Sequence, residues 1–381
     1  MTTHRVRGRT LAMLIALLAI VALTLAACEE ADEDVADVDD EPDEEPDEPD
    51  DDEPDDDEPD DDEPDDDEPD DEEPDDEEPD DEEPAADEAH LTLGTGSTGG
   101  TYYPLGGAIA GVWSTEIDGV NVSTQATGAS VENARLITAG ELDVGMAVNG
   151  VAADAYAGEG EFEGEDHDFN IVGNVYGEVM QVVAREDSGI ETIADMEGQR
   201  VDLGPPGSGT EVLARDLLEF HDIDPEDDIE AFGDTFGDAA DNLRDGQIDA
   251  AFAILALPAA SIEEAATATD LNLVSIEGDP LDAALDADPT LSTLEVEPET
   301  YPDQEEPATF VTNWATMYAP SDMDEDLVYD LTRVLYDERE QIAEAHAVGE
   351  QIQIDTAVDG EGGIPLHPGA EAYYEEQDAL D

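Results

Sequence analysis

From Leu91 onward, short apolar runs alternate with stretches in which apolar residues recur every three or four positions. Short runs are typical of buried strands, and the wider spacing is typical of amphipathic helices. We predict strands over 91–93, 120–126, 143–148, 200–203 and 249–254, and helices over 102–117, 130–138, 192–197, 209–220, 237–245, 259–267 and 325–345. Because strands and helices alternate, we expect an α/β fold with parallel strands and crossover helices.

Two β-rich runs, 171–184 and 310–318, are longer than the other predicted strands. Each is long enough to leave one lobe and enter another, so we expect two α/β lobes joined by two crossing strands. The polar, glycine-containing segment 150–169 is predicted to be a loop. The expected boundaries are 91–178 for lobe 1, 179–310 for lobe 2, and 311–381 for the return to lobe 1 and the C-terminal helices.

A strand, a glycine-rich loop and a helix follow one another twice, with the loops at 94–101 and 207–210. Glycine lets backbone N–H groups converge, and a helix start adds unpaired N–H donors and a positive dipole end. Such a junction favours anions. We therefore expect the two loops to face a ligand held between the lobes.

Each loop is followed by a second shared pattern, in which a glycine ends a helix and an aspartate leads the next strand. The residues are Gly140 and Asp143 in the first copy, and Gly246 and Asp249 in the second. The repetition indicates two lobes of similar build.

Hydroxyl and aromatic side chains mark the expected cleft. Tyr102 and Tyr103 stand where the first loop meets its helix, and Tyr176 lies in the first long run; each suits either core packing or a cleft wall. Arg135 and Arg185 suit either a ligand carboxylate or surface ion pairs. The hydroxyl residues at the loops suit both helix capping and ligand binding, and they are Ser97, Thr101, Ser130, Ser208 and Thr210.

The chain is extremely acidic, with 109 Asp and Glu against 10 Lys and Arg and a formal net charge of −99. Residues 91–381 hold 65 acidic residues and seven arginines, about −58 net. This charge excludes nucleic acid as a partner, because binding it requires neutralised phosphates. It also predicts a surface adapted to high salt, which screens self-repulsion over a Debye length of about 3 Å at 1 M.

The N-terminal segment, residues 1–28, is basic and then apolar, and it ends in Leu25-Ala26-Ala27-Cys28. This sequence looks like a bacterial lipobox, so we predict a lipoprotein signal peptide with Cys28 as the lipidated residue. An uncleaved membrane anchor is the alternative. Residues 29–90 consist largely of Asp, Glu and Pro, which predicts a disordered acidic spacer between membrane and folded part.

The patterns of common enzymes fit poorly. Gly94-x-Gly96-x-x-Gly99 matches a dinucleotide fingerprint, but the second strand lacks the acid that would hold the ribose. The absence of lysine excludes a Walker A loop and a pyridoxal Schiff base. The histidines are scattered and Cys28 is the only cysteine. We predict no enzymatic activity, no cofactor and no metal.

Five stretches together resemble the TAXI family (TRAP-associated extracytoplasmic immunogenic proteins), and they span about 90 to 381: LTLGTGSTGGTYYPLGGAIA, ATGASVENARLITAGELDVGMA, VDLGPPGSGTEV, LRDGQIDAAF and IPLHPGAEAYYEE. TAXI proteins are solute-binding subunits of tripartite ATP-independent periplasmic (TRAP) transporters. The resemblance implies a type II periplasmic-binding-protein fold. It also implies delivery to a permease driven by an ion gradient, and ligands such as glutamate and related small carboxylates.

By the same resemblance, the ligand-binding residues are Ser97, Thr98, Gly99, Gly100, Thr101, Tyr102, Tyr103, Thr127, Gly128, Ser130, Gly207, Ser208, Gly209 and Thr210, to which we add Tyr176. Family members often carry a glycine before the proline of Leu255-Ala256-Leu257-Pro258, and this chain does not.

We therefore expect a membrane-tethered extracytoplasmic receptor for a small carboxylate or amino acid, feeding TRAP permease subunits. The alternatives are the binding subunit of an ABC-type importer, a sensor, or an enzyme on the same bilobal fold. A neighbouring permease gene or turnover of a bound ligand would discriminate among them.

Overall fold

The computed structural model describes residues 89–380, so the predicted signal peptide, Cys28 and nearly all of the 29–90 spacer lie outside the described residues. The first lobe begins with β1 (Ala89–Gly94), α1 (Tyr102–Glu116), β2 (Val120–Gln125), α2 (Ser130–Ala139) and β3 (Val144–Val148). These elements match the predicted ones within two residues at each end. The strands pair in parallel in the order β2-β1-β3.

The second lobe repeats this arrangement. Its elements are β5 (Arg200–Asp202), α4 (Gly209–Phe220), β6 (Glu230–Phe232), α5 (Phe236–Arg244), β7 (Ala250–Leu255) and α6 (Ala260–Ala268). The parallel strands lie in the order β6-β5-β7, the counterpart of β2-β1-β3. The sequence did not predict β6, because it has three residues and none of them is buried.

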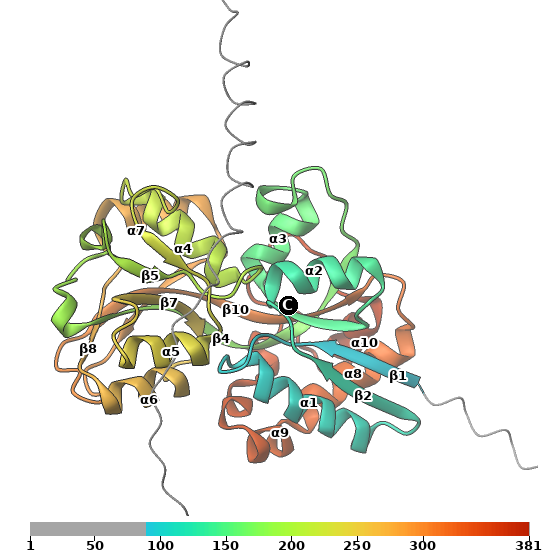
Figure 1. Cartoon of the computed structure of the whole chain (residues 1–381). Helices are drawn as coiled ribbons and strands as arrows, with labels where there is room; N and C mark the ends of the chain where they lie inside the picture. The colour runs from blue at the N-terminus through green and yellow to red at the C-terminus, as the bar shows by residue number, and fades with distance from the viewer. Residues whose placement is uncertain (1–88, 381) are drawn as a thin grey trace, which may run out of the picture. The chain divides into compact units, whose positions relative to one another are not determined.

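Two long strands, β4 (Phe169–Arg185) and β10 (Ala308–Pro320), cross between the lobes side by side (Figure 1). They pair antiparallel from Thr312 opposite Val179 to Pro320 opposite Phe169. The second half of β4 also pairs with β7, while β10 pairs with β3. The structure thus confirms two α/β lobes joined by two crossing strands.

The remaining elements extend this frame. In the second lobe β8 (Leu271–Leu273) pairs with β4, α7 (Gly278–Ala287) follows, and β9 (Ser292–Val296) pairs with β10. In the first lobe α8 (Glu325–Asp337) and α10 (Pro368–Glu376) pack together, and Trp113 Nε1 of α1 donates to Leu331 O of α8. None of the helices within 89–380 has the length and apolar content of a membrane span.

Two predictions of local structure were wrong. The segment 150–169 is largely helical, with α3 (Asn149–Ala157) and a 3-10 turn (Gly160–Phe162). Its glycines and acids suggested a loop, but Val151, Ala152 and Ala155 are buried and hold the helix against the core. The predicted helix 325–345 is two helices, α8 and α9 (Arg339–Ala345), because Glu338 leaves helical geometry at φ −100° and ψ 19°.

The repeated glycine and aspartate have the same structural role in each lobe. Gly140 and Gly246 adopt left-handed φ angles of 71° and 70°. Asp143 Oδ2 then accepts a hydrogen bond from Thr92 N of β1 at 2.7 Å. Asp249 Oδ2 accepts one from Arg200 N of β5 at 3.0 Å. Each aspartate directly precedes its own strand, β3 or β7, and ties the start of that strand to the neighbouring parallel strand.

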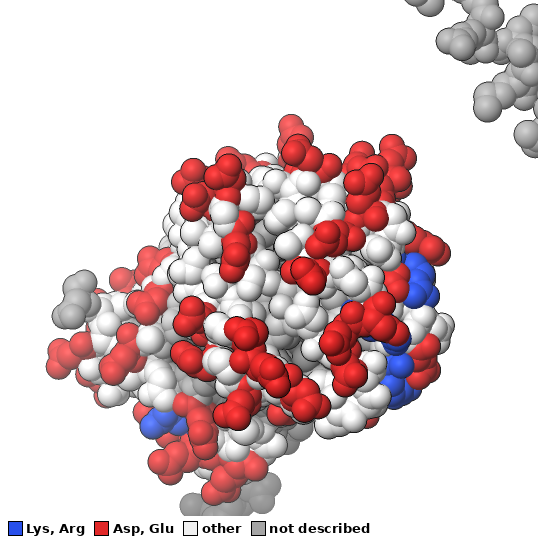
Figure 2. Space-filling view, turned by 90° about the vertical axis from the view of Figure 1, so that its left-hand side faces the viewer, with Lys and Arg blue, Asp and Glu red and all other residues white. Residues whose placement is uncertain are grey.

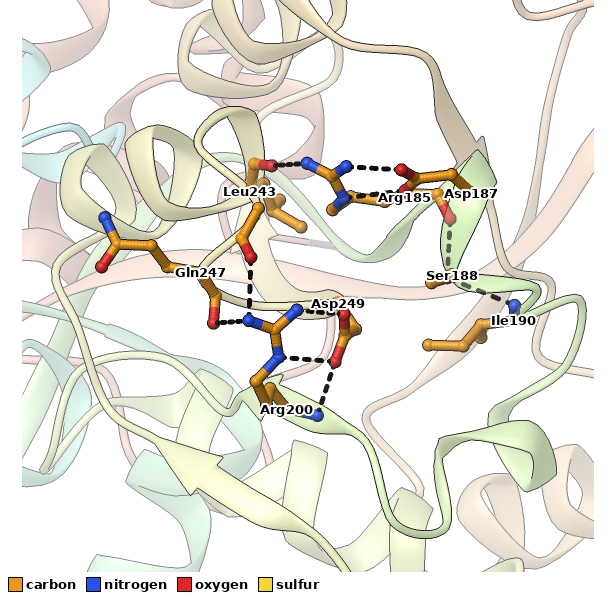
Figure 3. Close-up of polar contacts among 9 residues, drawn as sticks. Arg185, Asp187, Ser188, Ile190, Arg200, Leu243, Gln247 and Asp249 are labelled. Carbon is orange, nitrogen blue, oxygen red and sulfur yellow. Dashed lines mark hydrogen bonds and ion pairs between the residues drawn. The ribbon is translucent and has the colours of Figure 1, made fainter.

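The arginines of the second lobe form ion pairs within the lobe (Figure 3). Arg185 donates to both carboxylate oxygens of Asp187 at 2.9 and 2.7 Å and to Leu243 O at 2.8 Å. Arg200 donates to both oxygens of Asp249, and this contact lowers the pKa of the Asp249 carboxyl. In the first lobe Arg135 pairs with Glu165 at 3.0 Å. Arg135 and Arg185 thus serve ion pairs, one of the two uses predicted.

Carboxylates cover much of the second lobe's outer surface. Figure 2 shows acidic side chains over the visible face, with arginines only in small separate patches. A surface of one sign repels itself when few counterions are present.

We expect the protein to lose thermal stability at low ionic strength and to regain it in molar salt. The measurement is the melting temperature in NaCl from about 0.05 M to about 2 M, across which the screening length falls roughly sixfold. A parallel series in sodium sulfate separates screening from the salting-out of apolar groups. A flat melting temperature in NaCl contradicts the prediction.

Candidate functional site

The N-termini of α1, α2 and α4 meet at a cavity of about 30 Å³ between the two lobes, and Phe236 at the start of α5 also lines it. The loop before α1 and the start of α2 come from the first lobe, and the start of α4 comes from the second. The crossing strand β4 supplies Tyr176 and Glu178. The volume admits one or two water molecules, so residues of the wall must move outward to admit a solute of several heavy atoms.

Four hydroxyl groups in the cavity wall are oriented by backbone N–H donors. Thr101 Oγ1 accepts from Ala256 N at 3.1 Å, and Ser130 Oγ accepts from Val148 N at 3.1 Å. Ser208 Oγ accepts from Glu211 N at 3.1 Å as the N-cap of α4, and Thr210 Oγ1 accepts from Ile254 N at 3.0 Å. Because each oxygen already accepts one bond, its own O–H proton can donate elsewhere.

Ser97 adds a fifth hydroxyl to this group. Its Oγ lines the cavity, is buried, and has no hydrogen-bond partner among residues 89–380. Buried polar atoms are nearly always paired, so an unpaired donor in a cavity wall favours a ligand acceptor nearby.

Glu178 is the single charged residue among the described residues that line the cavity. It is 2 % exposed, and its Oε2 and Oε1 accept hydrogen bonds from Tyr102 and Tyr176, each at 2.8 Å. Burial raises the pKa of the Glu178 carboxyl to about 8 and raises both phenol pKa values well above their usual range. The sequence analysis missed this residue. The available signal was its position, as the single acid in the run 171–184.

Strain accompanies the site at Ala129, which precedes α2 and lines the cavity. Its φ of 83° and ψ of −130° lie in a region that non-glycine residues rarely adopt. Residues held in such conformations cost on the order of 1–3 kcal/mol and cluster at ligand sites.

The cavity contains many of the predicted site residues: Ser97, Gly100, Thr101, Tyr102, Ser130, Tyr176, Ser208, Gly209 and Thr210. The others lie outside its wall: Thr98, Gly99, Tyr103, Thr127, Gly128 and Gly207. Thr127 holds the loop instead, since its hydroxyl contacts the buried Asn133 Oδ1 at 2.7 Å and accepts from Ala129 N at 3.0 Å. Asn133 in turn donates to Thr95 O and Met146 O and fixes β1 against β3.

Gly99, Gly128 and Gly207 lie where the two lobes touch. Gly207 O accepts from Val131 N at 3.0 Å and from Glu132 N at 3.3 Å, so a second-lobe carbonyl caps α2 of the first lobe. A methyl group added at Gly128 would overlap Pro206 O, and one at Gly99 would overlap Gly237 N. Glycine therefore permits the close approach of the lobes seen here.

A larger hollow of about 660 Å³ lies outside the cavity and shares Gly100, Thr101 and Leu255 with it. Tyr103, 44 % exposed, belongs to this hollow together with His346 and parts of α5 and α6. Only the smaller cavity combines three helix starts, oriented hydroxyls and a buried acid, so we place the candidate site there. No cluster of potential metal ligands occurs within residues 89–380.

Comparison with known proteins gives a family and several structures. The sequence profile of the NMT1-like family matches residues 93–377. The methylphosphonate complex of PhnD1 from Prochlorococcus marinus is 10 % identical with a TM-score of 0.49, covering 76 % of this chain and 99 % of that one. The periplasmic aliphatic sulphonate binding protein SsuA from Escherichia coli is 17 % identical with a TM-score of 0.42, covering 75 % and 83 %. The expected periplasmic-binding-protein fold is confirmed, with its two lobes and two crossing strands.

Proposed function

The chain belongs to the NMT1-like family of solute-binding proteins, and from this premise we propose that it captures a small carboxylate-bearing solute outside the cytoplasm. It then passes the solute to a membrane transporter. Binding is non-covalent, and the solute contacts both lobes.

The convergence of three helix N-termini on one cavity carries this proposal. Helix-start N–H groups and hydroxyls stabilise a carboxylate over short range without a positive side chain. No arginine lines the cavity within the described residues. In so acidic a protein, fixed dipoles that act only at short range are a suitable way to hold an anion.

For the transporter, we propose an ABC-type importer, because the matched family is of the ABC-type substrate-binding class. The motifs shared with TAXI proteins favour a second candidate, a TRAP permease driven by an ion gradient. Solute uptake into vesicles that contain the permease encoded by the neighbouring gene distinguishes the two. Dependence on internal ATP supports the first, and dependence on an imposed ion gradient supports the second.

A thermal-shift screen in molar salt tests the solute class, since a ligand that binds only the folded state raises its stability. The panel contains amino acids, dicarboxylates, sulfonates, phosphonates and neutral sugars. We expect carboxylate-bearing compounds to raise the melting temperature. A response confined to sugars contradicts the proposal.

Substitution Ser208→Ala is expected to weaken binding of the best compound by about 0.5–3 kcal/mol, the range for one lost hydrogen bond. Ser208 lies in the cavity wall, and its loss also removes the α4 N-cap. The control is Asp324→Ala, which removes the side-chain N-cap from α8, a helix that supplies no residue to the cavity wall. If both variants bind equally well, Ser208 serves only as a cap.

We also propose that Cys28 anchors the protein as a lipoprotein and that the 29–90 spacer separates anchor from cleft. Cys28→Ser should release the protein from membranes and leave solute affinity unchanged. The measurement is fractionation after a high-salt wash, followed by the same binding assay. A Cys28→Ser protein that stays membrane-bound indicates an uncleaved anchor in residues 11–27 instead.

A further inference from the structure

Resting on the proposed function, we propose that the solute carries a protonated nitrogen besides its carboxylate, and that Glu178 is the counter-charge for this nitrogen. The solute class is then a zwitterion that carries both a carboxylate and an ammonium group, such as an amino acid. A betaine, whose nitrogen carries no proton, does not belong to this class. The inference comes from the cavity wall, where many donors stand beside a single acidic acceptor.

The donors in the wall require an acceptor on the solute. The hydroxyls of Ser130, Ser208 and Thr210 each already accept a backbone N–H, and each can donate its own proton to the solute. The N-termini of α1, α2 and α4 add positive dipole ends. One end of the solute is therefore an anion.

Glu178, by contrast, requires a cationic group on the solute. Each of its oxygens accepts one phenol proton, from Tyr102 or Tyr176, and a carboxylate oxygen accepts about two bonds. The two phenols fix the carboxyl group at the wall and leave it acceptor capacity toward the cavity. A buried carboxylate is costly unless a cation is near, and within residues 89–380 no arginine or histidine lines the cavity. An ammonium group on the solute would supply that cation.

This pairing links binding to a proton. The titratable groups that face Glu178 are Tyr102 on α1 and Tyr176 on β4, and Asn313 opposite it on β10 is uncharged. Because burial raises the pKa of Glu178 to about 8, the carboxyl is protonated at neutral pH before a cation arrives. A bound ammonium favours the ionised form, so the proton leaves on binding. At pH values below the pKa of Glu178 in the free protein, the affinity for the solute should therefore increase by up to about tenfold for each unit that the pH rises.

Isothermal titration calorimetry with matched probes tests the inference. The probes are L-glutamate against glutarate and L-alanine against propionate, which differ only in the amine. We expect the wild type to prefer the amine member of at least one pair by about tenfold or more. Titrations at about pH 6.5 in buffers of different ionisation enthalpy should show release of roughly one proton per amine probe, and none for its partner.

The variant Glu178→Gln keeps the size of the side chain and removes the charge, so its preference for the amine member should fall to about twofold or less. Glu186→Gln makes the same change at an exposed position just after β4 and should leave the preference intact. If Glu178→Gln does not fold, proton release by the wild type decides the question.

Either of two results with the matched pairs overturns the inference. One is equal binding of both members of every pair, and the other is an amine preference that survives in Glu178→Gln. Binding restricted to amine-free carboxylates overturns the inference and leaves the proposed function standing. Failure of every carboxylate to bind contradicts both.

Discussion

A methyl group at Gly128 is expected to hold the two lobes apart and to weaken solute binding by about 10- to 100-fold. The residue lies in the first lobe, and its added Cβ would overlap the backbone oxygen of Pro206 in the second. A backbone atom cannot rotate away as a side chain can. Overpacking of this kind typically costs about 1–3 kcal/mol, and here only the closed state bears the cost.

The closed state has little room to relax at this point. Gly207, next to Pro206, accepts hydrogen bonds from Val131 N and Glu132 N at the start of α2. Moving the Pro206 loop outward would therefore break the contacts that cap α2 from the other lobe. Gly209→Val should act in the same way, because its Cβ position lies 2.7 Å from Val148 Cγ2 and 3.2 Å from Ser130 Oγ across the cleft.

The matched control is Gly107→Ala, because a methyl group at that position of α1 meets nothing within 4 Å. Binding is measured by calorimetry with the tightest compound of the screen, and closure by the change in radius of gyration on adding it. Gly128→Ala should bind weakly and stay extended, while Gly107→Ala should resemble the wild type. Unchanged affinity in Gly128→Ala means that the solute-bound lobes stand wider apart than the structure shows.

Much of the frame was predictable because its signals are local. Apolar spacing located the strands and helices around the two glycine loops, and the length of the runs at 171–184 and 310–318 predicted β4 and β10. The structure has a cavity where the two loops meet, and the prediction that they bind a ligand there stays a prediction. The spacing of residues in the sequence could not predict which residues contact one another across the cleft.

Glu178 and Gly128 show this limit. Among 109 acidic residues, the position of Glu178 as the single acid in the run 171–184 is a weak signal, and only the fold brings Tyr102 of α1 against it. Gly128 was predicted to touch the ligand, but the structure places it against Pro206 and outside the cavity wall. The helix α3 was missed for a related reason, because the partners that bury Val151 and Ala155 are distant in sequence.

The repeated aspartates yield the second large expected effect, which is on stability. Asp249→Ala should destabilise the protein by about 2–4 kcal/mol, because Arg200 N and the Arg200 guanidinium lose their acceptor together. The Asp249 side chain is 15 % exposed, so water replaces these bonds only in part. Asp143→Ala in the first lobe should cost less, about 1–2 kcal/mol, since Asp143 receives a single backbone N–H.

The sign of the pH dependence follows from the lowered pKa of Asp249. A carboxyl whose pKa is lower in the folded than in the unfolded state stabilises the fold above its unfolded pKa, near about 4, and this stabilisation is lost as the pH falls through the folded pKa. The wild-type advantage over Asp249→Ala should therefore be complete at neutral pH and shrink in acid. Because removing any negative charge relieves repulsion in this protein, the control is Asp245→Ala, an exposed acid that pairs with Arg244 at 3.0 Å. Urea unfolding in molar salt gives the free energies, and equal stability of Asp249→Ala and Asp245→Ala would show that the shared aspartate does not hold β5 to β7.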